Sequence, residues 1–210
     1  MDVFRGWENY TERISANWKK TVKSEDTVVI GGDISWATDF AGAKADFEFL
    51  HSLPGKKILL KGNHDYWWST VSKIIAFFKE CGFDDFYVLH NNFYTNGKIA
   101  LCGTRGWIYD GAAVDEKVIN RECGRLERSL SPAVEAGLDP IVFLHYPPAY
   151  GEYVSDKIAD VLFKYNIKNV YYGHIHGYGF NKALSNLKDI KMKLVSADCI
   201  DFTPFFICKY

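Results

Sequence analysis

Apolar positions along the chain alternate between helical spacing and short continuous runs. Apolar residues three or four positions apart predict a helix near the start, which Trp7, Tyr10, Ile14 and Trp18 define. Short continuous apolar runs follow, the first two of which end in glycine, and such runs are typical of strands buried in a parallel sheet. Four such strands are predicted, at 27–32, 56–62, 141–148 and 169–177.

Further helices are predicted between these strands, at 40–53, 69–81, 119–130 and 158–165. Residues 86–104 indicate two strands around an Asn96-Gly97 turn, which is a strong hairpin signal. Residues 192–210 indicate further strand, and Pro132 is expected to end or kink its helix. There is no internal repeat or linker, so we predict one α/β domain over residues 1–210.

Composition narrows the class of protein further. A chain of 210 residues with 48% hydrophobic residues and a net charge of −1 can bury a sizeable core. This net charge near zero argues against electrostatic binding to long nucleic acid or to an acidic membrane surface. Glu8 and Glu12 interrupt the first apolar positions, and no run is long enough to span a bilayer. Five cysteines without a C-x-x-C spacing indicate buried thiols in a reducing compartment, so we expect a cytoplasmic protein without a membrane partner.

Polar groups able to bind a metal follow the apolar runs. Asp33 follows the first run, Asn63 the second, His145 the third, and His174 and His176 the fourth. In open α/β sheets, ligands bind beyond the carboxyl ends of the strands. A lone histidine is more often structural, but four strand ends that deliver such groups to one edge indicate a metal site.

Four motifs carry a resemblance to a known family. "GD" at 32–33, "GNHD" at 62–65, "LHYPP" at 144–148 and "GHIHG" at 173–177 resemble, in order, the motifs of the calcineurin-like metallophosphoesterases. The segments "GWENY", "KGNHDYWW" and "GTRGW" look most similar to a compact bacterial branch of predicted phosphohydrolases. The resemblance implies a two-sheet α/β sandwich flanked by helices, with a two-metal site on one edge.

The resemblance also implies a division of the ligands. Asp33 would bridge the two metals, Asn63, His145 and His174 would complete one of them, and His176 would belong to the other. Imidazole, carboxylate and amide donors without a thiolate favour Mn, Fe, Zn or Ni. The implied reaction is hydrolysis of a phosphomonoester or phosphodiester by a metal-activated water. The substrate would be a small phosphoester or a phosphoprotein.

Three more residues are candidates for the chemistry. His64 has no ligand role and is the candidate general acid that protonates the leaving oxygen, with Asp65 holding its ring. Asp65 could equally cap the helix at 69–81, and the two roles are compatible. Arg105 in "GTRGW" could contact a substrate phosphate through two hydrogen bonds, or could form a structural ion pair with a helix carboxylate.

One family motif is missing from this chain. The family begins with a strand that ends in D-x-H, and no D-x-H precedes Asp33. Two of the ligands that would share a metal with His176 are therefore absent, and we expect one tightly held metal. Either the chain starts at an internal methionine, which we favour, or the gene encodes a shortened protein. The alternative function is a single-metal module that binds phosphate-bearing ligands or a partner with little turnover. The lost strand would expose a sheet edge that could support self-association.

Overall fold

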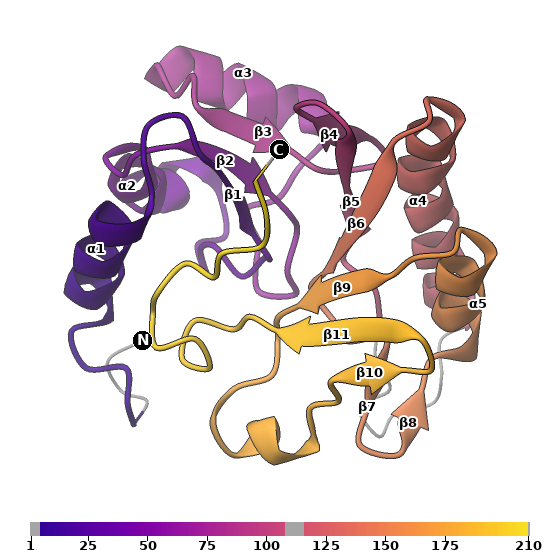
Figure 1. The fold of residues 1–210 in the computed structure, drawn as a ribbon. Helices are drawn as coiled ribbons and strands as arrows, with labels where there is room; N and C mark the ends of the chain where they lie inside the picture. The colour runs from indigo at the N-terminus through magenta and orange to yellow at the C-terminus, as the bar shows by residue number, and fades with distance from the viewer. Residues whose placement is uncertain (1–4, 108–115, 210) are drawn as a thin grey trace.

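The computed structural model describes residues 5–107 and 116–209. Two β-sheets face each other, and helices cover the outer face of each sheet (Figure 1). This arrangement confirms the expected α/β class and the two-sheet architecture. The motif-bearing loops emerge from the carboxyl ends of parallel strands in both sheets.

The first sheet has three parallel strands, β1 (Thr27–Ile30), β2 (Lys56–Leu59) and β3 (Phe86–Val88). The helices of this half are α1 (Tyr10–Thr21), α2 (Phe40–His51) and α3 (Val71–Cys81). Phe47 of α2 and the apolar side of α3 pack on β2 and β3 in one cluster of buried side chains. The four predicted elements from 27 to 81 are therefore present, each within a few residues of its expected bounds.

The second sheet has six strands in the order β10-β11-β9-β6-β5-β4. The six strands are β4 (Phe93–Thr95), β5 (Ile99–Thr104), β6 (Asp139–Leu144), β9 (Asn169–Tyr172), β10 (Asn186–Leu187) and β11 (Ile190–Leu194). The four central strands are parallel, and β4 and β10 are antiparallel edges. The helices α4 (Glu116–Glu135) and α5 (Asp156–Lys164) cover its outer face. A small hairpin, β7 (Ala149–Tyr150) and β8 (Tyr153–Val154), and a 3-10 turn, η1 (Gly177–Lys182), complete the described elements.

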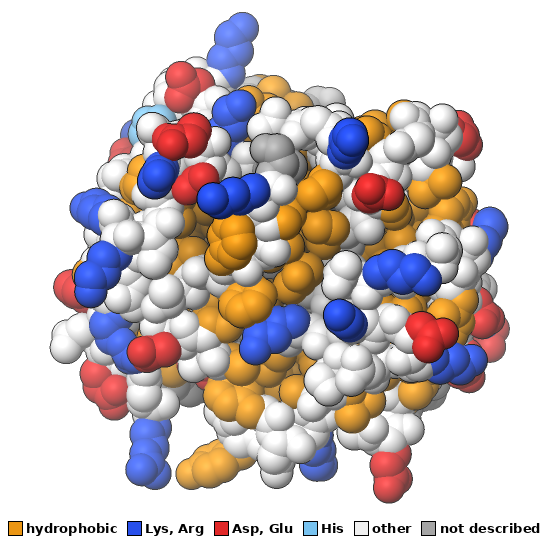
Figure 2. Space-filling view, in the orientation of Figure 1, with side chains coloured by type: hydrophobic (Ala, Val, Ile, Leu, Met, Phe, Trp, Pro, Cys, Tyr) orange, Lys and Arg blue, Asp and Glu red, His pale blue; other side chains and the backbone are white. Residues whose placement is uncertain are grey.

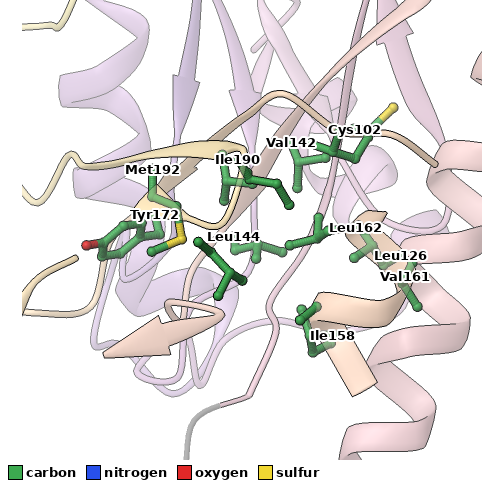
Figure 3. Close-up of a cluster of buried hydrophobic side chains, with 14 of the residues drawn as sticks. Cys102, Leu126, Val142, Leu144, Ile158, Val161, Leu162, Tyr172, Ile190 and Met192 are labelled. Carbon is green, nitrogen blue, oxygen red and sulfur yellow. The ribbon is translucent and has the colours of Figure 1, made fainter. Parts of the chain in front are cut away.

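Successive side chains of a strand point to opposite faces of its sheet, so the second sheet contributes to two apolar layers, one between the sheets and one under its helices. On β6, Ile141 and Phe143 face the first sheet, where they meet Ile58 of β2. Val142 and Leu144 face the other way, toward α4 and α5. Figure 3 shows this outer cluster, in which side chains from the sheet meet Leu126, Ile158 and Leu162 of the two helices. Both faces of β6 are apolar, which explains why its sequence is a continuous apolar run.

Three sequence predictions need correction. Residues 86–104 hold three strands and not two, because β3 pairs with β2 in the first sheet before the chain crosses to the β4–β5 hairpin of the second. Among the described residues after Leu194, no strand is assigned, so the predicted terminal strand ends there. Pro132 lies inside α4 and does not end it, since the helix runs on to Glu135, and a kink at Pro132 stays a prediction.

The strand β1 lies at an edge of the first sheet, with β2 as its one partner strand in the described part of the chain. All four of its residues are half-buried. Figure 2 shows hydrophobic side chains gathered down the middle of the face that Figure 1 presents, with basic side chains among and around them. The sheet edge that the sequence predicts is therefore present, and self-association through it stays a prediction.

The five cysteines are free thiols. Cys102 is buried, whereas the other four are partly exposed, so the expectation of buried thiols holds for Cys102 alone. Within residues 5–107 and 116–209, every helix is too short or too polar to cross a membrane.

Candidate metal centre

Four of the predicted ligands meet where the two sheets come together. The ligand atoms of Asp33, His145 and His174 lie within 4.8 Å of one another. Asn63 completes the group, because its Oδ1 lies 2.7 Å from Nε2 of His145 and 2.9 Å from Nδ1 of His174. Asp33 and Asn63 follow β1 and β2 of the first sheet, whereas the two histidines follow β6 and β9 of the second.

The hydrogen bonds of His145 fit a metal ligand. Its Nδ1 donates to the carbonyl oxygen of Gly31 at 2.9 Å, and its side chain is almost fully buried. Burial lowers the pKa of His145, so the ring is neutral and carries a lone pair on Nε2. That lone pair faces the side-chain amide oxygen, Oδ1, of Asn63. Two lone pairs at this distance repel each other unless a cation binds both, so the donor set fits a metal ion.

His174 shares this environment. Burial, followed by the neighbouring His145, lowers the pKa of His174 to about 4. Its backbone has a φ of 69°, and Asp33 has a φ of 55°. Left-handed backbone is uncommon outside glycine and clusters at functional sites, where the surrounding structure holds it in place.

Two glycines allow the loops of the first sheet to approach closely. A Cβ on Gly62 would lie 2.0 Å from Oδ1 of Asp33, and a Cβ on Gly32 would lie 2.6 Å from the backbone nitrogen of Gly62. Gly32 also has a φ of 98°. Glycine is therefore required at both positions, because any side chain would push Asp33 away from Asn63.

Asp65 organises these loops and does not hold the ring of His64. Its carboxylate accepts hydrogen bonds from the backbone N–H groups of Asp33, Ile34, Ser35 and Gly62, and from the indole of Trp67, at 2.7–3.2 Å. The side chain is 1% exposed. The predicted helix cap is also wrong, since Thr70 occupies the N-cap of α3. A buried carboxylate satisfies this many N–H groups better than a neutral side chain could, which explains its position.

His64 lies beside the ligand group, on the same turn as Asn63. Its backbone N–H donates to Oδ1 of Asp33 at 2.8 Å. Its Nδ1 lies 2.9 Å from the hydroxyl of Tyr66, and its ring stacks on Trp36 with the centroids 4.3 Å apart. Tyr66 and Trp36 therefore orient the ring, in the role that the sequence analysis gave to Asp65.

His176 lies outside the three-residue group and pairs with a residue that sequence reasoning missed. Its Nδ1 lies 2.7 Å from Oδ1 of Asp198, whose Oδ2 accepts from the backbone N–H of Gly177 at 3.0 Å. The ring of Trp7 packs edge to face against the imidazole of His176, with the two ring centroids 5.5 Å apart. Asp198 follows β11 as His176 follows β9, so the strand-end rule could have found it had the end of β11 been recognised.

Arg105 follows β5 and lies next to the ligand group. Its carbonyl oxygen accepts from the backbone N–H of Tyr146, whose ring lies 4.3 Å from that of His174. The guanidinium lies 3.9 Å from the carboxylate of Glu122 on α4 and over the ring of Trp107. The structure thus shows the helix carboxylate that the ion-pair alternative requires, at a distance too long for a hydrogen bond.

Comparison with known proteins identifies the class of this fold and site. Residues 3–178 match the family described as calcineurin-like phosphoesterase. The chain therefore belongs to the calcineurin-like phosphoesterases, a family of metal-dependent phosphoester hydrolases. The Asp, Asn and two His side chains that meet at the strand ends are a donor set suited to such a metal.

Two solved structures share the fold. One crystal structure has a TM-score of 0.56 and 11% sequence identity, covering 90% of this chain and 86% of that chain. The crystal structure of TT1561 of Thermus thermophilus has a TM-score of 0.51 and 16% identity, covering 81% of this chain and 78% of that chain. No curated protein matches the sequence.

Proposed function

We propose that this protein hydrolyses a phosphomonoester or phosphodiester at the group formed by Asp33, Asn63, His145 and His174. The observation that supports the proposal is the convergence of these four side chains from the two sheets, with their donor atoms facing one another. Mn, Fe, Zn or Ni would suit these donors. A small phosphoester or a phosphoprotein would be the substrate.

Asp33, Asn63, His145 and His174 would hold the metal, which would supply positive charge against the phosphoryl oxygens and a nucleophile from water at neutral pH. Asp33 supplies the negative charge among the ligands and is held by His64 through its backbone N–H. His145 is fixed by its bond to Gly31, which aims Nε2 at the centre. His64 would donate a proton to the leaving oxygen from Nε2, since Nδ1 is bonded to Tyr66.

A second candidate is a single-metal module that binds phosphate-bearing ligands with little turnover. The observation that favours it is the position of His176, which pairs with Asp198 and lies outside the group of Asp33, His145 and His174. A family member with two metals uses both to activate the attacking water and to stabilise the leaving oxygen. One metal would still bind a phosphate.

Hydrolysis assays on reconstituted protein separate the two candidates. The metal-free protein is loaded in turn with Mn²⁺, Fe²⁺, Zn²⁺ and Ni²⁺, and the hydrolysis of p-nitrophenyl phosphate and bis(p-nitrophenyl) phosphate is followed. Hydrolysis at least about a hundredfold faster than in metal-free protein, and lost in His145→Ala, supports the phosphoesterase. Asp46→Asn, on the exposed side of α2, is the matched control. Metal binding without turnover on either ester would instead support the binding module.

A further inference from the structure

Two large aromatic side chains are exposed on the loops that carry metal ligands. Trp36 is 49% exposed and Tyr66 is 57% exposed, whereas Trp67 is 3% exposed and packs in the core of the first sheet. Trp36 lies three residues after Asp33, and Tyr66 lies three residues after Asn63. Single exposed aromatic residues are common on protein surfaces, so their position rather than their exposure carries the argument.

Both exposed rings contact His64. The indole of Trp36 stacks on the imidazole with the centroids 4.3 Å apart and the planes 21° apart. The ring of Tyr66 stands nearly perpendicular to the imidazole, at 83°, and its hydroxyl lies 2.9 Å from Nδ1. The backbone N–H of His64 donates to Oδ1 of Asp33 at 2.8 Å. The three rings therefore form one aromatic cluster at the edge of the candidate metal centre.

The backbone beneath this cluster is held in place. The carboxylate of Asp65 accepts from the backbone N–H of Ser35, the residue directly before Trp36, at 3.2 Å. Tyr66 directly follows Asp65, and its own N–H donates to the carbonyl oxygen of His64 at 2.8 Å. Groups that are ordered before a ligand binds lose less conformational entropy on binding, so both rings are suited to hold a ligand.

The position of His64 indicates which part of a substrate would meet these rings. In the proposed function, His64 donates a proton to the leaving oxygen, so the leaving group would lie beside the same imidazole. In the described part of the chain, this imidazole is the one ring on which Trp36 packs, and about half of Trp36 faces solvent. Aromatic rings prefer stacked or edge-to-face contact with another ring, which stabilises more than burial of the same apolar area.

We propose that Trp36 and Tyr66 select phosphoesters whose leaving group carries an aromatic ring within a few bonds of the leaving oxygen. The ring would lie against these two side chains while the phosphoryl group lies at the metal ligands. The substrate class is then an aryl or arylmethyl phosphoester. This assignment rests on the proposed function for the leaving group, but binding of an aromatic ligand at the two rings requires no hydrolysis.

Phosphonates test this selection without turnover, because a CH₂ group replaces the ester oxygen. Protein loaded with Mn²⁺ is titrated by calorimetry with benzylphosphonate, cyclohexylmethylphosphonate and methylphosphonate. The benzyl compound should bind at least about tenfold more tightly than the methyl compound, and about fivefold more tightly than the cyclohexyl compound. The cyclohexyl compound offers a similar apolar area without a π face, so it separates aromatic contact from simple burial of apolar surface.

Variants of the two rings identify the residues that make the contact. Trp36→Leu and Tyr66→Leu should each reduce the preference for benzyl over cyclohexylmethyl to about twofold or less, with the affinity for methylphosphonate unchanged. Trp36→Phe should retain part of the preference. Tyr66→Phe keeps the ring and loses only the hydroxyl at His64, so it should retain the preference in full. Phe206→Leu, at a 70% exposed position after β11, is the matched control and should change nothing.

The outcomes are distinguishable from failure of the proposed function. Equal affinity of the native protein for the benzyl and cyclohexylmethyl compounds would overturn the proposal, because apolar area alone would then explain binding. A preference that survives in both Trp36→Leu and Tyr66→Leu would overturn it as well, and so would an equal loss of affinity for all three phosphonates. Absence of phosphoester hydrolysis with the aromatic preference intact would reject the proposed function alone.

Discussion

Nδ1 of His176 lies 2.7 Å from Oδ1 of Asp198, twenty-two residues further along the chain. A carboxylate at Nδ1 holds the proton there and leaves the lone pair on Nε2, which is the arrangement found behind metal-binding histidines. His176 is therefore oriented as a ligand would be, although it lies outside the group of Asp33, His145 and His174. The two histidines of "GHIHG" thus have different surroundings and should differ in what they contribute.

We predict that His174→Ala loses most of the bound metal, whereas His176→Ala retains it. His174 contacts Asn63 within the ligand group, and His176 contacts Asp198 instead. Metal content after dialysis, measured by elemental analysis, checks the prediction. Asp46→Asn, an exposed carboxylate on α2, is the control and should leave the metal content unchanged.

Melting temperatures of the same variants separate ligation from a structural role. If both histidines only fix the turn between β9 and η1, both variants should lose stability. Their metal content should then decrease in proportion to that loss of stability. Parallel metal loss from His174→Ala and His176→Ala would contradict the asymmetric assignment.

The native chain should retain about one equivalent of transition metal after dialysis, because four donors converge on one centre. A chelator that removes this metal should lower the melting temperature, since a ligand that binds the folded state stabilises it. The measurements are elemental analysis and thermal unfolding with and without chelator. Two equivalents surviving dialysis would show that other residues complete a second centre.

Asp65→Asn should lower the free energy of unfolding by about 3 kcal/mol and weaken metal binding. The substitution places an NH₂ group against N–H donors from both ligand-bearing loops. Asp46→Asn, an exposed carboxylate on α2, should have little effect. Denaturant unfolding checks the prediction, and native stability with a reduced rate of hydrolysis would return Asp65 to a role in the chemistry.

His64→Ala should slow hydrolysis of an ester with a poor leaving group by about a hundredfold, and that of an ester with a good leaving group much less. A poor leaving group needs the proton that His64 would donate, whereas a good one leaves without it. Tyr66→Phe should show a weaker form of the same pattern, because Tyr66 only orients the ring. Rates on alkyl and nitrophenyl phosphates measure the difference, and equal losses on both would remove His64 from this role.

Most of the elements were predictable because local patterns determine them. The runs that became β1, β2, β6 and β9 are apolar and end in glycine or histidine, and burial between layers requires such runs. The family motifs then identified Asp33, Asn63, His145 and His174 as candidate ligands. These residues meet because the carboxyl ends of parallel strands lie at one edge of a sheet. Segment 86–104 was predicted as one hairpin because a sequence does not show which sheet a strand joins, and β3 joined the first sheet.

The partners of the polar side chains were decided by the tertiary structure alone. Asp65 is next to His64 in the sequence, yet its carboxylate turns toward the backbone of Asp33 and Gly62, because buried N–H groups require an acceptor. Asp198 reaches His176 only because β11 pairs with β9 and brings the two following loops together. The sequence determined which residue types stand at the strand ends, whereas the packing of the loops determined which atoms face one another. Hydrogen bonds between distant segments depend on distances that no local pattern encodes.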